Sequence, residues 1–244
     1  MSGAEIVRIE DLRFSYDGFT PILRGVSLRV MEGKSVAIMG RSGSGKTTLL
    51  KLVAGLLAPY EGRIELRVPP KKIGYVPQQI GLVKNLTALQ NVLLGSLGRP
   101  AGPGRILGFF ERDEVDRAMG LLDDLGIADL ADRKAALLSG GERQRVAVAR
   151  AFMQSPSLLL ADEFVSDLDI VNAIEVMQIT GEMCRKNGVS VLMTMHDAFL
   201  VRDFADRVAL LKSGRIIQEL PANQLDPNIL AALLTVDVEA DAKS

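Results

Sequence analysis

Residues 40–47 read Gly40-Arg41-Ser42-Gly43-Ser44-Gly45-Lys46-Thr47, which matches the G-x-x-x-x-G-K-[ST] pattern of a phosphate-binding loop. The apolar run 35–39 before it predicts a strand, and residues 46–57 after it predict a helix. Glycines allow backbone N–H groups to turn toward a phosphate chain, and the helix N-terminus adds the positive end of its dipole. We expect Lys46 to reach the β and γ phosphates and Thr47 to hold Mg²⁺. Residues 40–48, including Thr48, are therefore the predicted nucleotide-binding segment; the simpler alternative is a flexible Gly/Ser turn.

A pair of carboxylates, Asp162 and Glu163, follows the apolar run 158–161. Ligands of open α/β sheets bind at the carboxyl ends of the strands. We expect Asp162 to hold the hydration shell of Mg²⁺ and Glu163 to polarise an attacking water. Taken alone, the pair is better explained as an acidic helix N-cap. The phosphate loop in the same chain favours the catalytic interpretation.

The composition limits the classes of function. The chain has 244 residues, 29 Lys plus Arg, 30 Asp plus Glu, and a formal net charge of −1. With no broad basic surface, 5% aromatic residues and no Trp, the chain is not expected to bind nucleic acid. Its one cysteine, Cys184, has no partner for an internal disulfide. No signal-peptide layout or run of roughly 20 apolar residues occurs, so we expect a soluble protein that reaches a membrane only through a partner chain.

The order of apolar patterns predicts the architecture. Strands alternate with helices at both ends of the chain, while the middle is mostly helical, which is typical of an α/β core with an inserted helical subdomain. Short strands are expected within 4–30, around the turn Asp17-Gly18. The other expected strands are 63–68, 73–76, 189–194, 207–211 and 216–220, and the other expected helices are 87–94, 115–125, 141–153, one from 170, and a tail after 221.

The heptapeptide Leu138-Ser139-Gly140-Gly141-Glu142-Arg143-Gln144 resembles the signature motif of ATP-binding-cassette (ABC) proteins. Small residues, a hydroxyl and free N–H groups at a helix start also make a second anion-binding surface, although an ordinary helix start is the alternative. In the family, the signature helix caps the γ-phosphate held by a partner subunit. The resemblance therefore implies ATP, Mg²⁺ and a second nucleotide-binding subunit, expected to be a copy of this chain.

The resemblance extends from Ile6 to Leu220. It implies a P-loop NTPase (RecA-like) α/β core with an N-terminal antiparallel β subdomain and an inserted helical subdomain. We expect one ABC ATPase domain over 1–244, with 1–79 and 157–220 as the core plus β subdomain, 80–156 as the helical signature subdomain, and 221–244 as a C-terminal tail.

Four further positions resemble functional residues of the family. Tyr16 corresponds to the aromatic ring that stacks on adenine, although a strand aromatic packed in a core is the alternative. Gln78 resembles the Q-loop glutamine, which approaches Mg²⁺ and water; a solvated loop amide is the alternative. His196, the only histidine, resembles the switch histidine that contacts the γ-phosphate, although a lone histidine is usually structural. Asp169 resembles the end of the D-loop, which crosses the dimer interface.

Two positions depart from the family pattern. Phe164 follows Glu163 where the family typically has proline, and Asp167 occupies a D-loop position usually held by a small residue. A carboxylate at 167 would lie near an interface crowded with phosphate charge. We hypothesise that Asp167 weakens closure or slows turnover. The expected dimer interface comprises Ser139, Gly141, Asp167 and Asp169.

Residues 90–99 and 105–110 are similar to those of phosphonate-type importer ATPases. The resemblance implies import of a small solute, a phosphonate or related anion, with transmembrane permease subunits and a solute-binding protein. The expected location is cytoplasmic, on the inner face of the cell membrane. The apolar segment 80–97 would form a groove for a permease helix, or else a satellite of the core.

The sequence also bears on three alternative functions. It does not distinguish an importer from an exporter or lipid-handling ATPase of the same fold. An ABC ATPase acting on nucleic acid would usually need two cassettes, long inserts or basic tails. A binding module without catalysis is disfavoured because Lys46, Asp162, Glu163 and His196 are all present.

Overall fold

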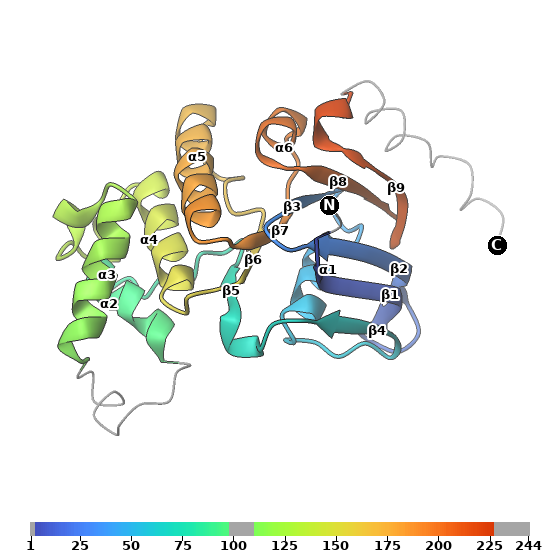
Figure 1. The fold of residues 1–244 in the computed structure, drawn as a ribbon, viewed down its shortest axis with the longest axis horizontal. Helices are drawn as coiled ribbons and strands as arrows, with labels where there is room; N and C mark the ends of the chain where they lie inside the picture. The colour runs from blue at the N-terminus through green and yellow to red at the C-terminus, as the bar shows by residue number, and fades with distance from the viewer. Residues whose placement is uncertain (1–2, 98–109, 227–244) are drawn as a thin grey trace.

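The computed structural model describes residues 3–97 and 110–226. The predicted loop 98–105, most of the importer-like segment 105–110 and the tail from 227 lie outside the described residues. Within the described part, the strands form two sheets that occupy the middle and one side of the molecule, and helices α2 to α5 lie toward the other side (Figure 1).

The first sheet is antiparallel, with strand order β2-β1-β4. It contains β1 (Glu5–Ser15), β2 (Pro21–Met31) and β4 (Glu61–Leu66). Alternating apolar side chains such as Leu12 and Val26 point into a core shared with α1 (Lys46–Val53). The predicted N-terminal antiparallel sheet is confirmed, but residues 4–30 contribute two long strands to it, not several short ones. Register shifts between Ile9 and Arg13 keep β1 and β2 paired across their length.

The second sheet has strand order β5-β6-β7-β3-β8-β9. Its strands are β3 (Ser35–Met39), β5 (Ile73–Val76), β6 (Leu158–Asp162), β7 (Ser190–Thr194), β8 (Arg207–Lys212) and β9 (Arg215–Pro221). All neighbours are parallel except the β8–β9 hairpin. Parallel pairing brings the carboxyl ends of β3, β6 and β7 to one edge, where Asp162 pairs with Thr194.

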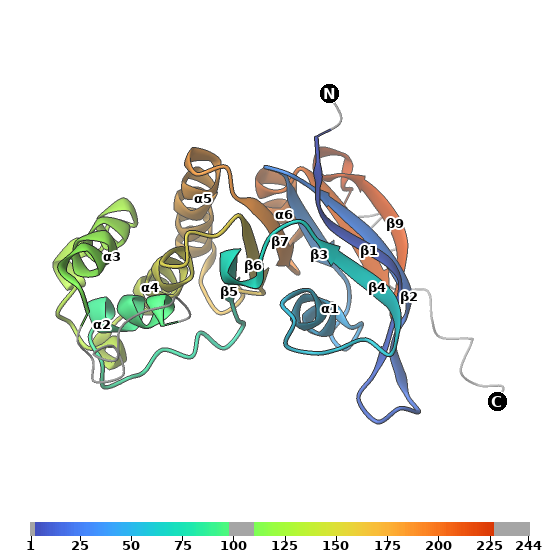
Figure 2. The same cartoon turned by 60° about the horizontal axis from the view of Figure 1, so that its bottom comes forward.

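The described part of the connection between β5 and β6 folds into a separate group of helices on the β5 side of the molecule (Figures 1 and 2). They are α2 (Ala88–Leu93), α3 (Arg112–Asp124) and α4 (Gly140–Phe152). The remaining helices, α5 (Ile170–Lys186) and α6 (Ala198–Phe204), pack together beside β7. Short 3-10 turns cover Pro70–Lys72, Leu94–Ser96, Ala128–Leu130, Ala135–Leu137 and Ala222–Gln224.

One helix prediction was wrong in its extent, and one helix was not predicted. The first helix ends at Val53 and not at Leu57, because Gly55 adopts a φ of 72°, which stops the helix. The seven-residue helix α6 was not predicted; the Asp197 side chain starts it by accepting bonds from Phe199 N and Leu200 N. In the tail after Pro221, only the turn Ala222–Gln224 lies within the described residues.

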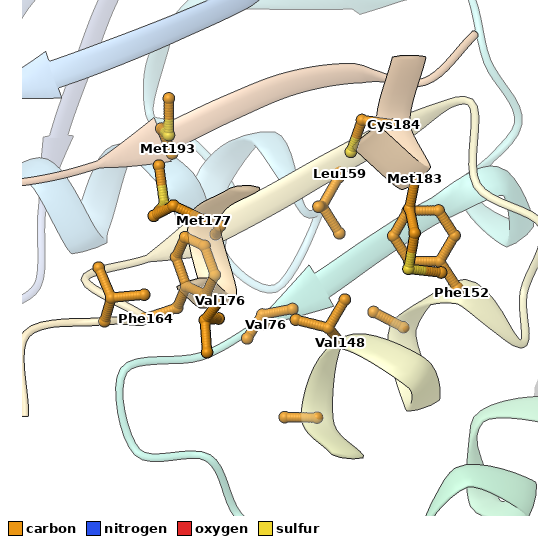
Figure 3. Packing of buried hydrophobic residues seen from close by; sticks show 14 of the residues in the cluster. Val76, Val148, Phe152, Leu159, Phe164, Val176, Met177, Met183, Cys184 and Met193 are labelled. Carbon is orange, nitrogen blue, oxygen red and sulfur yellow. The ribbon is translucent and has the colours of Figure 1, made fainter. Parts of the chain in front are cut away.

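The larger hydrophobic core joins the helical group to the central sheet. Val148 and Phe152 of α4 pack there with Leu159 of β6 and with Met177 of α5. Figure 3 shows Phe164 close to Val176 and Met177, at the end of β6 that carries the acidic pair. The residue after Glu163 is therefore a buried core residue, 5% exposed.

Candidate active site

The phosphate loop lies between β3 and α1, as predicted. Gly45 precedes the helix with a φ of 106°, and a Cβ there would lie 2.7 Å from Leu23 Cδ2. A glycine is therefore required on both conformational and steric grounds. The Lys46 side chain is 4% exposed, and its ammonium group donates to Gly40 O at 3.0 Å and to Arg41 O at 3.3 Å. The Lys46 side chain thus folds back over the backbone of the phosphate loop.

Four predicted site residues meet at the Glu163 carboxylate. Lys46 Nζ lies 3.2 Å from Glu163 Oε1, and His196 Nε2 lies 2.6 Å from the same oxygen. Gln78 Nε2 donates to Glu163 Oε2 at 3.0 Å. These side chains come from α1, from the loop after β5 and from the loop after β7. Because parallel strands end at one edge, residues more than a hundred positions apart converge on one carboxylate.

Asp162 is 1% exposed and is held by two hydroxyl groups. Thr47 Oγ1 donates to Asp162 Oδ1 at 3.0 Å, and Thr194 Oγ1 donates to the same oxygen at 2.7 Å. The Thr194 hydroxyl also accepts a bond from Glu163 N at 2.9 Å. Thr194 was not predicted as a site residue. Its position at the end of an apolar strand, two residues before His196, was the available signal.

The backbone of Glu163 is unusual for a residue that has a side chain. Its φ is 43°, in the left-handed region that non-glycine residues seldom adopt. Its N–H group is directed at Thr194, 3.2 Å from the carbonyl oxygen and 2.9 Å from the hydroxyl. Such strain persists where the surroundings fix the conformation, and it accumulates at functional sites. Here it turns the Glu163 carboxylate toward Lys46.

The donors around Asp162 suit Mg²⁺. A hydroxyl and a carboxylate are hard oxygen ligands, which Mg²⁺ prefers. Within residues 3–97 and 110–226, no group of three or more His, Cys, Asp or Glu side chains could hold a metal. A Mg²⁺ ion at Thr47 and Asp162 would therefore take its other ligands from phosphate and water, as this ion commonly does.

A cavity of about 270 Å³ adjoins the phosphate loop, and Tyr16, Ile22, Lys46, Thr47, Gln78 and Glu163 line it. Tyr16 is 61% exposed, so it is not buried in a core as the alternative required. Its hydroxyl lies 3.3 Å from Thr48 Oγ1, and its ring meets Phe14 edge-on at 4.8 Å. Ile22 was not predicted, because one apolar residue in an alternating strand gives no motif.

The structure does not bring the signature residues to this cavity. Ser139 is the N-cap of α4; its hydroxyl accepts from Glu142 N at 3.3 Å, while Glu142 Oε2 accepts from Ser139 N at 2.6 Å. A Cβ on Gly140 would lie 3.1 Å from Leu168 Cδ2, and one on Gly141 would lie 3.2 Å from Asn172 Oδ1. These glycines thus allow α4 to approach Leu168 and the first turn of α5.

The two D-loop carboxylates differ in their surroundings. Asp169 caps α5 by accepting bonds from Val171 N and Asn172 N, each at 3.1 Å. A bond from the Asn172 amide, followed by the backbone bonds, lowers the pKa of Asp169. Asp167 is exposed. Asp167, which stands where the family usually has a small residue, therefore places a carboxylate on the surface.

The loop that follows Gln78 is fastened to the signature helix. Arg150 of α4 donates to Ile80 O at 2.6 Å and to Gly81 O at 3.0 Å. Most apolar residues of 80–97 pack in or against the larger core and not in a separate satellite of it. Val83 and Leu97 remain 45% and 50% exposed. Among the described residues, no helix combines the length and apolar character needed to cross a bilayer.

Comparisons with known proteins show what the chain as a whole resembles. The family model described as "ABC transporter" matches residues 23–166. "Phosphonates import ATP-binding protein PhnC 2" of Synechococcus sp. is 37% identical over 238 residues, covering 92% of this chain and 88% of that protein. The counterpart from Bordetella parapertussis is 36% identical, covering 94% and 96%.

Solved structures give the same result. The ADP conformation of an ATP-binding cassette of an ABC transporter superposes with a TM-score of 0.82 at 27% identity, covering 95% of this chain and 99% of that chain. A dimeric bacterial ABC transporter cassette has a TM-score of 0.77 at 31% identity, covering 88% and 98%. The predicted P-loop NTPase fold class is thereby confirmed.

Proposed function

The chain belongs to the ABC transporter family, and on that premise we propose that it is the ATP-hydrolysing subunit that powers import of a small solute. The observation that carries the proposal is the convergence of Lys46, Gln78 and His196 on Glu163, beside the phosphate loop. This group combines a phosphate-binding cation with a candidate base for water. ATP is the substrate.

The contacts suggest how nucleotide would engage the site. Lys46 Nζ lies 3.2 Å from Glu163 Oε1. A bound γ-phosphate would compete for the Lys46 ammonium and release Glu163 from it. Gln78 and His196 would then hold the carboxylate where it can orient an attacking water. Mg²⁺, held through Thr47 and Asp162, would neutralise charge on the phosphates.

Two chains are proposed to share each nucleotide. The residues assigned to ATP by resemblance, Ser139, Gly140 and Gly141, do not line the cavity of Lys46. A second chain whose signature helix covers the phosphates would complete the site. We propose that 80–156 acts as the helical subdomain that carries this motif, with 1–79 and 157–220 as the nucleotide-binding part and 221–244 as the tail.

The cargo and partners are inferred from the relatives. Their names describe phosphonate import, so we propose a phosphonate or related anion as cargo, and an exporter is not favoured. Permease subunits would hold the ATPase at the inner, cytoplasmic face of the membrane, and a solute-binding protein would deliver the cargo. Val83 and Leu97 are exposed apolar residues that a permease helix could cover.

Steady-state hydrolysis of ATP by the purified chain tests the function. Replacing the base in Glu163→Gln should lower kcat by about 10²- to 10⁴-fold while ATP still binds. The control is Glu182→Gln, an exposed glutamate on α5, which should hydrolyse ATP at the wild-type rate. Equal rates in all three proteins would reject Glu163 as the base.

Cargo is tested in proteoliposomes that contain the complete transporter. Hydrolysis should rise when binding protein loaded with methylphosphonate is added, and not when it is loaded with an uncharged sugar.

The Asp167 hypothesis has its own test. The Asp167→Ala variant should form the closed dimer more readily or hydrolyse ATP faster than the wild type. Unchanged hydrolysis and dimerisation would remove that idea.

A further inference from the structure

The segment that carries Gln78 is attached at two points, which belong to different parts of the molecule. Figures 1 and 2 show this segment running from β5 in the central sheet to α2 in the helical group. At the first point, Gln78 Nε2 donates to Glu163 Oε2 at 3.0 Å. At the second point, the Arg150 guanidinium of α4 donates to the backbone of residues 80–81. Only Gln79 lies between the two attachments.

Arg150 makes the second attachment with two separate nitrogens. Its Nη2 donates to Ile80 O at 2.6 Å, and its Nη1 donates to Gly81 O at 3.0 Å. Because the guanidinium is planar and rigid, two bonds to consecutive carbonyls fix both the position and the direction of the backbone. Burial lowers the pKa of Arg150, and the two carbonyls compensate the guanidinium for part of its lost hydration.

The residues that follow are attached to the same group of helices. Asn91 of α2 is buried, and its Oδ1 accepts from Val83 N at 2.8 Å. Its Nδ2 donates to Val83 O at 3.1 Å and to Thr87 O at 2.9 Å. From Ile80 onward, the backbone is therefore held by the helical group, whereas the side chain of Gln78 is bound to the residue that follows β6.

The short distance along the chain between the two attachments limits how independently they can move. Each residue extends the chain by at most about 3.6 Å, so residues 78 and 80 are never more than roughly 7 Å apart. A shift of α4 that exceeds the slack of this single residue must displace Gln78 relative to Glu163. The position of α4 thus limits where the Gln78 amide can lie.

Helix α4 also joins Arg150 to the signature motif. Ser139 is the N-cap of this helix, and Arg150 lies in its last turn. At about 1.5 Å of rise per residue, the two lie roughly 16 Å apart along one rigid element. In the proposed function, Ser139 contacts a nucleotide held by a second chain. A displacement of α4 at that contact would reach Gln78 through Arg150.

From the two attachments and the single residue between them, we propose that Arg150 is a positioning residue for hydrolysis. It holds the backbone beside Gln78, so that the placement of the Gln78 amide on Glu163 follows the position of α4. The proposal rests on the proposed function, in which Glu163 is the base. Because Arg150 does not line the cavity beside Lys46, it affects kcat through Gln78 and not through the binding of ATP.

The first test measures the segment itself and needs no ATP. A nitroxide attached to Gln79→Cys, at an exposed position, reports the motion of the segment by electron paramagnetic resonance. The native Cys184 is buried, so the introduced thiol is labelled selectively. Arg150→Met should increase the mobility of the nitroxide, and unchanged mobility would overturn the proposal. The matched control is Arg117→Met on α3, which removes a bond to Phe152 O in the helical group but none to this segment.

Steady-state kinetics separate positioning from general stability. Arg150→Met should lower kcat about tenfold with KM for ATP little changed, while Arg117→Met should keep the kcat of the wild type. If Arg150 acts through Gln78, its substitution in a Gln78→Ala background should cause no further loss. Losses that multiply in the double variant would overturn the proposal.

Thermal unfolding shows whether each variant is folded. If Arg150→Met is not, Arg150→Lys and Arg117→Lys replace the methionine pair in both tests, because lysine keeps the charge but not the planar fork. If the wild-type chain hydrolyses no ATP, the proposed function fails, while increased nitroxide mobility in Arg150→Met would still support the attachment. If the wild type hydrolyses ATP and Arg150→Met keeps both its kcat and its nitroxide mobility, only the role of Arg150 is rejected.

Discussion

Among single residues, the Thr194 hydroxyl connects the two acidic side chains of the site. It donates to Asp162 at 2.7 Å and accepts from Glu163 N at 2.9 Å. Thr194→Val removes both bonds without changing the side-chain shape. We expect kcat to fall by about 10-fold or more with KM little changed, and the free energy of unfolding to fall by about 1–3 kcal/mol. Thr194→Ser keeps the hydroxyl and should restore kcat; a fully active valine variant would show that this hydroxyl positions nothing.

Cys184 makes stability depend on pH in the alkaline range. Burial raises its pKa from 9.0 to about 12. Above pH 9 the unfolded chain releases the thiol proton while the native chain keeps it, so the free energy of unfolding should decrease as pH rises from 9 toward 12. Urea unfolding at pH 8 and pH 10.5 measures this decrease. Cys184→Ala should show a smaller decrease than the wild type, and equal decreases would argue against a buried, protonated thiol.

Among the elements, the packing of the 3-10 turn Leu94–Ser96 on α4 depends on one glycine. A Cβ on Gly95 would lie 2.1 Å from Arg150 O, so Gly95→Ala must separate the two elements. We expect a loss of about 1–3 kcal/mol in the free energy of unfolding. Gly120→Ala is the matched change on exposed α3, and it should gain roughly 0.5–1 kcal/mol through helix propensity. Urea titrations of both variants measure these changes in the free energy of unfolding. If Gly95→Ala leaves that free energy unchanged, the 3-10 turn and α4 can move apart without cost.

Elements with a strong local signal could be predicted from the sequence, and others could not. The strand Ile73–Val76 and the helix that begins near Ser139 have clear apolar patterns or caps. Helix α6 has seven residues, too few to display a period. The order of strands in the central sheet depends on tertiary packing, which no local pattern records.

The same distinction applies to the candidate site. Lys46 and Glu163 belong to motifs that are contiguous in sequence, so the sequence alone identifies them as candidates. Thr194 and Ile22 act through neighbours that folding brings close, and no motif marks them.

At the scale of the whole molecule, one chain separates the two halves of its proposed nucleotide site. Figures 1 and 2 both show α4, whose N-cap is Ser139, and α1, which begins at Lys46, on different sides of the central strands. A single chain therefore cannot place its signature motif over the phosphates of a nucleotide bound at its own Lys46 without a large rearrangement. The solved dimeric cassette has the same fold at 31% identity, so pairing of two chains is compatible with this architecture.

This separation predicts a dimer that depends on nucleotide and on the charge at residue 139. Glu163→Gln with ATP and Mg²⁺ should sediment as a dimer, and without nucleotide as a monomer. Adding Ser139→Asp should keep the N-cap of α4, because aspartate caps as well as serine, yet its carboxylate would face the γ-phosphate held by the other chain. Thr87→Asp makes the same kind of change at the capping box of α2 and should leave the dimer intact. Sedimentation at several protein concentrations distinguishes these results. If the Ser139→Asp and Thr87→Asp proteins dimerise equally, the phosphates are not covered by Ser139 of a second chain.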